Sequence, residues 1–312
     1  MQIPRAVIGE LEKIAPGQVR ESEPMARHTS FGLGGPADIF LEPPTASAFK
    51  EAAALLDDSG VPIMILGRGT NILVRSGGID GAVLASRRAF DGIERRGRTL
   101  DVGSGVALAR ALRFCAEEGL SGIEGLAGIP GSVGGAVVTN AGSFGVAIGE
   151  RLREVVLFRP GSESRAVTVS DLPIAYRRTT LPAKSVIERA ILELDEADPE
   201  AVRRLEEDTL EKKWKAQPAD MRSAGCIFKN PPGESAGKLI DSVEMKGARV
   251  GGAVVSDRHA NFVLNDRGAT PEDVEELIGA VRARVQEATG IELDLEVEIV
   301  GKPAGGERRA RT

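Results

Sequence analysis

The chain has 312 residues, of which 42% are hydrophobic and 28% charged, with a net charge of −6. This length predicts two or three domains of about 100–150 residues each. The negative charge argues against non-specific binding of nucleic acid, and no apolar run approaches the ~18 residues of a membrane span. The first residues lack the basic-then-apolar order of a secretory signal, and two cysteines are too few for a disulfide framework. We therefore expect a cytoplasmic protein with neither a nucleic-acid nor a membrane partner.

Scarce residue types argue against two classes of catalytic site. The chain holds two histidines and two cysteines. An ordinary zinc site needs three or four such ligands at paired spacing, so no metal site is expected. Serine hydrolases carry Gly-x-Ser-x-Gly, and the nearest stretch, Gly-Ser-Phe-Gly at residues 142–145, is one residue short.

Apolar periodicity and turn residues predict the elements in chain order. A glycine cluster at residues 31–36 predicts a turn between strands. Helices are expected at residues 47–56, 106–118 (ending at Gly119), 199–215 and 271–289. Strands are expected at residues 62–66, 72–74, 82–86, 99–102, 154–158, 186–194 and 293–300, and around Val254 and Phe262.

Helices and strands therefore interleave without a clean series of βαβ units, which predicts an α+β fold. The composition changes at Gln217-Pro218, directly after a charged helix. We place the last domain boundary there. The expected domains are residues 1–80, 81–216 and 217–300, followed by a polar tail at 301–312.

Residues 67–71 read Gly-Arg-Gly-Thr-Asn and lie between two expected strands. Glycines there let backbone N–H groups approach an anion, and Thr70 and Asn71 add neutral donors, so a phosphate or pyrophosphate is a natural ligand. The alternative is a tight hairpin turn in which Asn71 adopts a left-handed conformation. The loop matches neither a Rossmann fingerprint nor a Walker loop.

A second glycine-rich stretch covers residues 125–136. Its small residues leave backbone that can lie against a flat or phosphorylated ligand. Residues 134–138 are expected to open a helix whose N-terminus faces an anion. A flexible loop is the alternative, although Ile129, Pro130 and Val133 stiffen the segment.

Two further motifs carry reactive side chains. Tyr176-Arg177-Arg178 contains the chain's single tyrosine, and a guanidinium is the usual partner of a carboxylate or a developing enolate. A plain surface arginine pair is the alternative. Residues 223–231 join the Cys226 thiol to an ammonium and an amide, and the thiol could be a nucleophile, a proton donor or a small buried side chain. Cys115, on the apolar face of its helix, is interpreted as structural.

In their order and spacing these motifs resemble the UDP-N-acetylenolpyruvoylglucosamine reductase family, and the resemblance covers nearly the whole chain. The motifs that carry it lie at residues 28–37, 67–71, 139–142, 176–177, 225–231, 256–262 and 295–301. Residues 226–241 run without an insertion, which resembles the branch that lacks an inserted tyrosine-bearing loop.

The resemblance implies a two-part FAD-binding region of the vanillyl-alcohol-oxidase (PCMH) type and a C-terminal α+β substrate domain. It implies an oxidoreductase in which NADPH reduces non-covalently bound FAD. The reduced flavin then passes hydride to the terminal carbon of UDP-N-acetylglucosamine enolpyruvate, giving UDP-N-acetylmuramate. This is a step of peptidoglycan precursor synthesis, and so of cell wall biogenesis, cell shape and cell division. We expect a monomer.

The resemblance also assigns residues. Arg177 and Glu296 match the family residues that stabilise the enol-like intermediate, and Cys226 stands where the family usually has the serine that donates a proton. The expected cofactor-binding residues are Gly67, Arg68, Gly69, Thr70, Asn71, Gly128, Ile129, Gly131, Ser132, Gly135, Asn140 and Ala141. Those expected to bind substrate are Tyr176, Lys229 and Asn230. Lys213 stands where the related branch often has arginine, a departure that concerns fine substrate contacts and not the reaction class.

Two other readings remain open. Another oxidase or dehydrogenase of the same FAD superfamily would need a different C-terminal domain. A non-catalytic nucleotide-binding protein would keep the glycine loops but would have no need of Arg177, Cys226 and Glu296 together.

Overall fold

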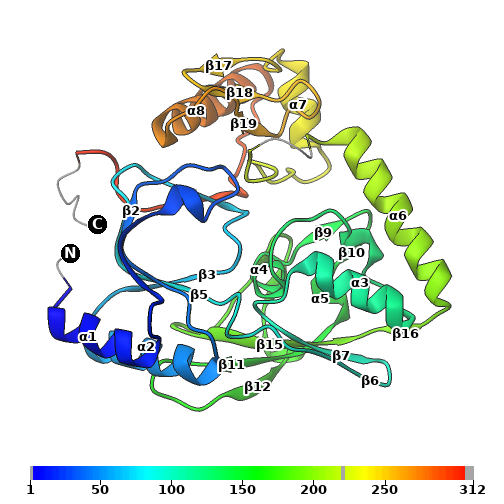
Figure 1. Ribbon diagram of the computed structural model, residues 1–312. Coiled ribbons are helices and arrows are strands. Elements are labelled where there is room, and N and C mark those ends of the chain that lie inside the picture. The colour runs from blue at the N-terminus through cyan, green and yellow to red at the C-terminus, as the bar shows by residue number, and fades with distance from the viewer. Residues whose placement is uncertain (1–2, 219–221, 306–312) are drawn as a thin grey trace. The chain divides into compact units, whose positions relative to one another are not determined.

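The computed structural model describes residues 3–218 and 222–305, which form two compact units (Figure 1). The first unit takes in residues 3–21, 39–68 and 81–213, and the second takes in the rest of the described chain. Most of the expected tail, residues 306–312, lies outside the described residues. The division between the units falls inside three strands, β1 (Val19–Pro24), β2 (Pro36–Leu41) and β5 (Ile79–Ala85).

The first unit is built on an antiparallel sheet of five strands in the order β12-β11-β15-β7-β6. Its strands are β6 (Ile93–Arg96), β7 (Thr99–Gly103), β11 (Leu152–Phe158), β12 (Arg165–Thr168) and β15 (Val186–Glu193). Helices α3 (Leu108–Glu118) and α4 (Val133–Val138) lie over it, and one apolar core joins them to the sheet (Figure 1). The sheet residues of that core include Val102, Val155, Leu157, Ala190 and Leu192.

A second core of the same unit forms under α1 (Arg5–Ile14) and α2 (Ala46–Asp58). Strand β3 (Ile63–Leu66) pairs in parallel with β5, at one edge of a sheet with the order β1-β2-β5-β3. The rings of Phe49, Phe90 and Phe158 pack together there, with centroids 5.0–6.2 Å apart. Aromatic packing thus links α2 to the five-stranded sheet.

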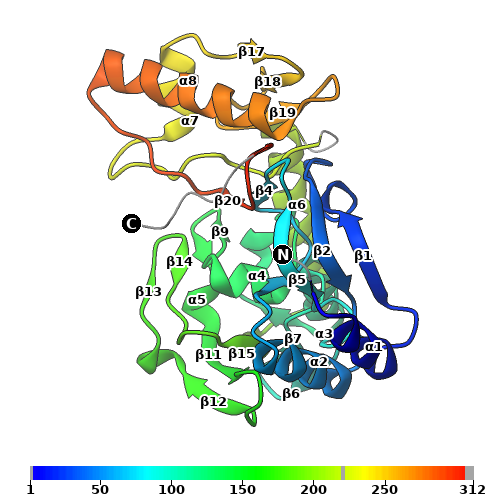
Figure 2. The same cartoon turned by 90° about the vertical axis from the view of Figure 1, so that its left-hand side faces the viewer.

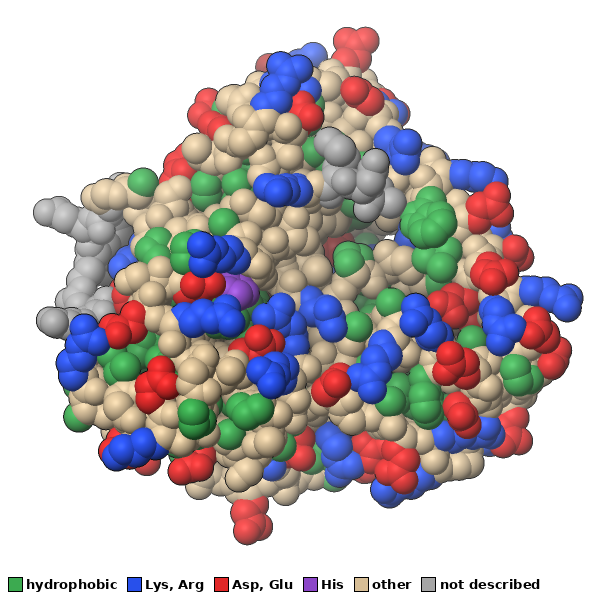
Figure 3. Space-filling model, viewed as in Figure 1, with side chains coloured by type: hydrophobic (Ala, Val, Ile, Leu, Met, Phe, Trp, Pro, Cys, Tyr) green, Lys and Arg blue, Asp and Glu red, His purple; other side chains and the backbone are tan. Residues whose placement is uncertain are grey.

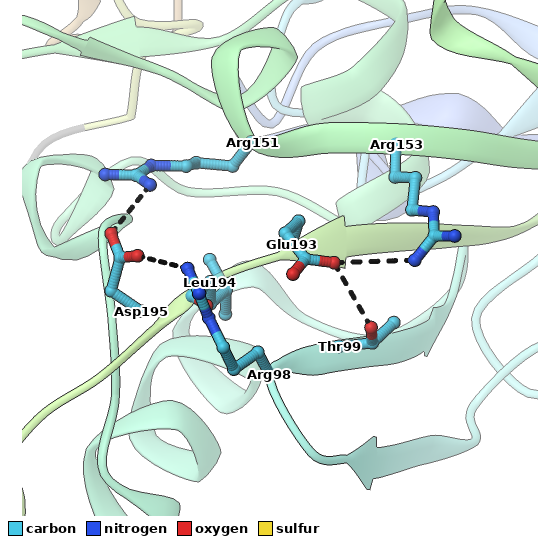
Figure 4. Close-up of polar contacts among 7 residues, drawn as sticks. All are labelled: Arg98, Thr99, Arg151, Arg153, Glu193, Leu194 and Asp195. Carbon is cyan, nitrogen blue, oxygen red and sulfur yellow. Dashed lines mark hydrogen bonds and ion pairs between the residues drawn. The ribbon is translucent and has the colours of Figure 1, made fainter.

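Charged side chains brace one part of the five-stranded sheet (Figure 4). Asp195 accepts from Arg98 at 2.6 Å and from Arg151 at 2.9 Å, and Glu193 lies 3.5 Å from Arg153. These groups are largely exposed, so each pair contributes at most about 1 kcal/mol. We interpret them as a solvated face.

The first unit also contains several short helices and strands. Helix α5 (Ile148–Arg151) is a single turn, and α6 (Pro199–Ala216) begins in this unit. Three short antiparallel pairs are β8 (Leu120–Ser121) with β16 (Asp195–Glu196), β9 (Gly142–Ser143) with β10 (Val146–Ala147), and β13 (Ile174–Ala175) with β14 (Arg178–Thr179). The 3₁₀ helices are η1 (Met25–Arg27) in the second unit and η2 (Glu124–Leu126) and η3 (Val169–Asp171) in the first.

The second unit packs α7 (Ala236–Ser242) and α8 (Pro271–Thr289) around a sheet with the order β17-β18-β19. These strands are β17 (Arg249–Val250), β18 (Ala253–Val255) and β19 (Val263–Asn265). Thr270 caps α8 through a capping box with Asp273, and Pro271 occupies its first turn. Separately, β4 (Ile72–Val74) pairs in parallel with β20 (Glu298–Val300).

The structure confirms the α+β fold class and the four expected helices, which are α2, α3, α6 and α8. The strand expected at residues 293–300 is present only as β20, because residues 294–297 bond instead to the irregular segment around Phe228. Helix α1 was not expected from the sequence. Leu11 is its buried residue and lies on the face that packs into the core.

Surface charge is mixed in sign. On the face shown in Figure 3, Lys and Arg side chains alternate with Asp and Glu, and hydrophobic side chains occur in small groups. Within residues 3–218 and 222–305, the helices are all too short or too polar to cross a membrane.

Candidate active site

The loop of residues 67–71 is not a hairpin turn. It leaves β3, which pairs with β5, and enters β4, which pairs with β20, so the two flanking strands do not pair with each other. The left-handed residue of the loop is Gly69, with φ +61°, and not Asn71. The hairpin alternative is therefore wrong. The division between the units falls between Arg68 and Gly69.

In the first unit, the beginning of this loop lies against the second glycine-rich stretch. A Cβ on Gly67 would lie 2.4 Å from the Ser132 hydroxyl oxygen, a distance that side chains cannot adopt. Gly67 thus lets two loops, both expected to bind the cofactor, come into contact. Arg68 beside it is exposed.

The sequence predicted a helix opening at residues 134–138, and α4 begins one residue earlier, at Val133. Ser132 caps this helix, because its hydroxyl accepts a hydrogen bond from the backbone N–H of Gly135 at 3.2 Å. The preceding N–H groups of Val133 and Gly134 donate to the carbonyls of Val106 and Ser104. The first N–H groups of α4 are therefore engaged inside the protein, and an anion at this loop would need other donors.

Lys213 holds the start of the glycine-rich stretch. Its side chain is buried, and its ammonium donates to the Ala127 carbonyl at 2.7 Å. It also lies 5.8 Å from the ring centroid of Phe144, an exposed aromatic side chain. This position identifies Lys213 as a support for the backbone at Gly128, a role that the sequence did not indicate.

In the second unit, the end of the loop is tied to the strand that carries Glu296. The Asn71 side-chain amide donates to the Glu296 carbonyl at 3.1 Å, and the Asn71 carbonyl accepts from the Glu298 N–H at 3.0 Å. The Gly69 carbonyl accepts from the Ser30 N–H at 2.9 Å, and the Ser30 hydroxyl donates to the Ser223 carbonyl at 2.5 Å. Residues 69–71 therefore share a hydrogen-bonded frame with Glu296 and with the segment before Cys226.

The Cys226 segment lies between two other backbone segments of the second unit. On one side, the N–H of Glu296 donates to the Ile227 carbonyl at 2.8 Å. On the other, Cys226 forms an isolated bridge with Phe262, and the Asn261 side chain both accepts from and donates to the Phe228 backbone, at 2.9 and 2.8 Å. Two of the expected catalytic residues thus lie on adjacent, mutually hydrogen-bonded segments.

The two cysteines differ in environment. Cys115 is buried in the core under α3, and burial, with nearby Glu124 adding to it, raises the pKa of its thiol to about 12. This confirms its structural interpretation. Cys226 is half-buried beside Val254 and Phe262.

We expect one of the two thiols to react in the native protein. Iodoacetamide at about pH 8 should modify Cys226, whereas buried, neutral Cys115 should react only after unfolding, because the thiolate is the nucleophile. Peptide mass mapping of native and denatured samples measures this. Labelling of Cys115 in the native state, or none at Cys226, would contradict the two environments.

Arg177 lies in the two-residue turn that joins β13 to β14, where Ala175 pairs with Arg178. Its φ of +55° is unusual for a residue with a side chain. The guanidinium carbon lies 5.2 Å from the ring centroid of Tyr176, which is 53% exposed. The turn presents a cation beside an exposed aromatic ring, an arrangement suited to an anionic, partly flat ligand.

The two glycine loops of the first unit fit a flavin nucleotide held close to backbone. Gly67 and Ser132 bring these loops into contact, and Gly128 and Pro130 remain exposed beside them. Nowhere in the described ranges do three His, Cys, Asp or Glu side chains group as metal ligands would.

The expected site residues therefore fall into two sets, one in each unit. The first unit brings together Gly67, Ser132 and Gly135, and joins Asn140 to the turn of Tyr176 and Arg177 through a bond to Ala175. The second brings together Asn71, Cys226 and Glu296, with Lys229 next to them through its N–H bond to Asp294. Asn230 accepts from the N–H of Ala236, the first residue of α7.

Besides Lys213, sequence reasoning missed three supporting side chains. Asn261 and Ser30 lay inside motifs quoted for the family but carry no charge, and Thr179 is a single hydroxyl residue. Ser30 lies next to a glycine cluster and Thr179 lies two residues from Arg177, and only these positions could have marked them.

Comparison with known proteins gives two matching family profiles and several similar relatives. The profile of an FAD binding domain matches residues 37–158, and that of the C-terminal domain of UDP-N-acetylenolpyruvoylglucosamine reductase matches residues 217–300. The chain is 42% identical to the UDP-N-acetylenolpyruvoylglucosamine reductase of Heliobacterium modesticaldum over 93% of each chain. It is 40% identical to that of Syntrophotalea carbinolica, over 97% of this chain and 100% of the relative.

A solved structure has a similar fold. The crystal structure of UDP-N-acetylenolpyruvylglucosamine reductase (MurB) from Thermus caldophilus superposes with a TM-score of 0.78 at 36% identity. The match covers 90% of this chain and 99% of that one. With relatives this similar along nearly its full length, the chain belongs to the UDP-N-acetylenolpyruvoylglucosamine reductase family and is an FAD-dependent oxidoreductase.

Proposed function

We propose that Arg177, Cys226 and Glu296 carry out the reaction for which this family is named. The chain reduces UDP-N-acetylglucosamine enolpyruvate to UDP-N-acetylmuramate, a precursor of peptidoglycan, with NADPH as the electron donor. The observation that most supports the residue roles is the backbone bond between Glu296 and Ile227, which puts Glu296 next to the Cys226 segment. The matched C-terminal profile argues against another oxidase of the FAD superfamily.

FAD held by the two glycine loops would supply hydride, taken from NADPH, to the terminal carbon of the enolpyruvyl group. Negative charge then grows on the carbon next to the carboxylate. Arg177 stabilises this charge because a guanidinium keeps its proton under all working conditions. Cys226 donates the proton that completes the product. Glu296 assists as a hydrogen-bond donor in its protonated form, because a carboxylate would repel the growing charge.

The remaining residues hold the ligands. Residues 1–80 and 81–216 carry the cofactor, mainly through the two glycine loops, and 217–300 carry the substrate. Tyr176, Lys229 and Asn230 contact the enolpyruvyl sugar nucleotide. The enzyme acts as a monomer in the cytoplasm, where NADPH and nucleotide sugars are available.

The test of these assignments separates the two half-reactions. The purified protein should be yellow and should bleach anaerobically on addition of NADPH. Mixing the bleached protein with the enolpyruvyl substrate should restore the colour. Bleaching without recovery of the colour would show that the protein binds FAD but acts on another class of substrate.

FAD should be bound tightly but not covalently. The loops at residues 67–71 and 128–136 contain neither histidine nor cysteine, and the nearby His28 ring is bonded to Glu23 at 2.9 Å with both side chains buried. Acid precipitation should leave the flavin in the supernatant. Yellow colour that remains with the precipitated protein would contradict this expectation.

A further inference from the structure

We propose that Asn140 is a positioning residue for Arg177 and not the cofactor ligand that the family resemblance implied; this inference rests on the role proposed above for Arg177. Asn140 is 9% exposed and lies just after α4. Its side-chain amide donates to the Ala175 carbonyl at 2.9 Å, and its side-chain oxygen accepts from the Gly149 N–H at 3.0 Å. The two ends of one buried amide therefore hold the β13–β14 hairpin and helix α5 together.

A second anchor holds the other strand of the hairpin. Thr179, 6% exposed, donates its hydroxyl to the Val137 carbonyl at 2.6 Å. Ala175 precedes the turn and Thr179 follows it, so both sides of Arg177 are fixed to the end of α4. Figure 2 shows the hairpin beside α4 and α5.

The close packing around Asn140 and its backbone conformation both favour asparagine between α5 and the β13–β14 hairpin. A Cβ on Gly149 would lie 2.7 Å from the Asn140 side-chain oxygen and 3.0 Å from Ile174 of the hairpin. Asn140 itself has a φ of +41°. Asparagine tolerates that conformation better than most residues and brings both a donor and an acceptor.

This anchoring matters because Arg177 lies in a strained turn. A left-handed arginine persists only where the surrounding structure holds it, and a misplacement of about 1 Å can cost about 100-fold in rate. Loss of the Asn140 donor should therefore move Arg177 without touching the substrate or the flavin directly.

The test uses the holoenzyme and Asn140→Asp, which keeps the size and the acceptor but removes the donor toward Ala175. Reoxidation by the enolpyruvyl substrate should slow by about 10-fold or more, while bleaching by NADPH stays within about 2-fold. In an Arg177→Ala background, Asn140→Asp should cause no further loss, because residues that act through one another are not additive.

Two further variants keep the result interpretable. Thr179→Val removes the second anchor without changing size and should also slow only reoxidation. Asn265→Asp is the matched control: Asn265 is 9% exposed, donates to the Phe31 carbonyl and accepts from the Ala269 N–H, both at 2.9 Å. It should lower thermal stability but not the rate of reoxidation.

Additive losses in the double variant would overturn the inference, as would wild-type reoxidation in Asn140→Asp or loss of flavin from it. If Asn140→Asp does not fold, wild-type reoxidation in Thr179→Val overturns it. If Arg177→Ala itself reoxidises at the wild-type rate, the proposed role of Arg177 fails instead.

Discussion

Replacing Arg177 with alanine should leave reduction by NADPH intact and slow reoxidation by the enolpyruvyl substrate by about 100-fold or more. The intermediate of that half-reaction carries a carboxylate next to a growing negative charge. Removing a charged donor at such a position typically costs about 3 kcal/mol, which corresponds to about two powers of ten in rate. NADPH oxidation develops no such charge, so the first half-reaction should be unaffected.

Anaerobic single-turnover experiments measure the two rates separately. The matched control is Arg178→Ala, because Arg178 is the next residue, is exposed and belongs to strand β14 rather than to the turn. It should reoxidise at nearly the wild-type rate. Equal effects of the two substitutions would mean that general positive charge, and not Arg177, governs the step. A wild-type rate in Arg177→Ala would show that the residue was misassigned.

The elements that could be predicted from sequence are those with strong local signals. Helix α3 ends at Gly119, which adopts the left-handed conformation that a C-cap glycine favours. Helix α8 begins at Thr270-Pro271 with the complete capping box. In both cases the decisive contacts lie within a few residues along the chain.

Pairing between distant segments could not be predicted in this way. Residues 293–297 alternate like a strand, but their partner is an irregular segment about 70 residues earlier, so only an isolated bridge forms at Leu295. The same limit applies to the loop at residues 67–71. Its glycines indicated close backbone approach, but only the tertiary structure shows that Gly67 faces Ser132 and Gly69 faces the His28 carbonyl.

The residues of the candidate site also divide into those that the sequence could identify and those that it could not. Arg177, Cys226 and Glu296 were identified through motifs, since charged and reactive side chains are rare enough to be informative. Asn261 and Lys213 act by holding backbone carbonyls and N–H groups, and such roles depend on burial and on long-range contacts. The chemistry of these two side chains alone therefore gives no indication of their supporting roles.

The replacement of the usual serine by Cys226 leads to the second large effect. Cys226→Ala should be reduced by NADPH at the wild-type rate and then stall after the substrate is added. The variant retains Arg177 and Glu296 but has lost the proton donor. Cys226→Ser should retain substantial activity, because an alcohol and a thiol can both donate. A thiol, with a reference pKa of about 8.5, is the more acidic donor but the weaker hydrogen-bonding group.

The backbone around Cys226 argues that these substitutions test chemistry and not folding. The segment is held by main-chain bonds from Ile227 to Asn261 and to Glu296, and by the Asn261 amide on Phe228. None of these bonds uses the Cys226 side chain. The half-buried thiol packs against a small apolar group that includes Val254, so alanine or serine should cost little stability.

Deuterium incorporation locates the lost step. In heavy water, wild type should place solvent deuterium on the carbon next to the carboxylate. In Cys226→Ala, hydride transfer would remain reversible while protonation is slow, so label should appear late at that carbon. Hydride exchange at the terminal carbon should then outpace product formation. If Cys226→Ala turns over like the wild type, the thiol only packs against Val254 and its neighbours. The proton must then come from another group, and Glu296, on the adjacent segment, would be the first residue to test.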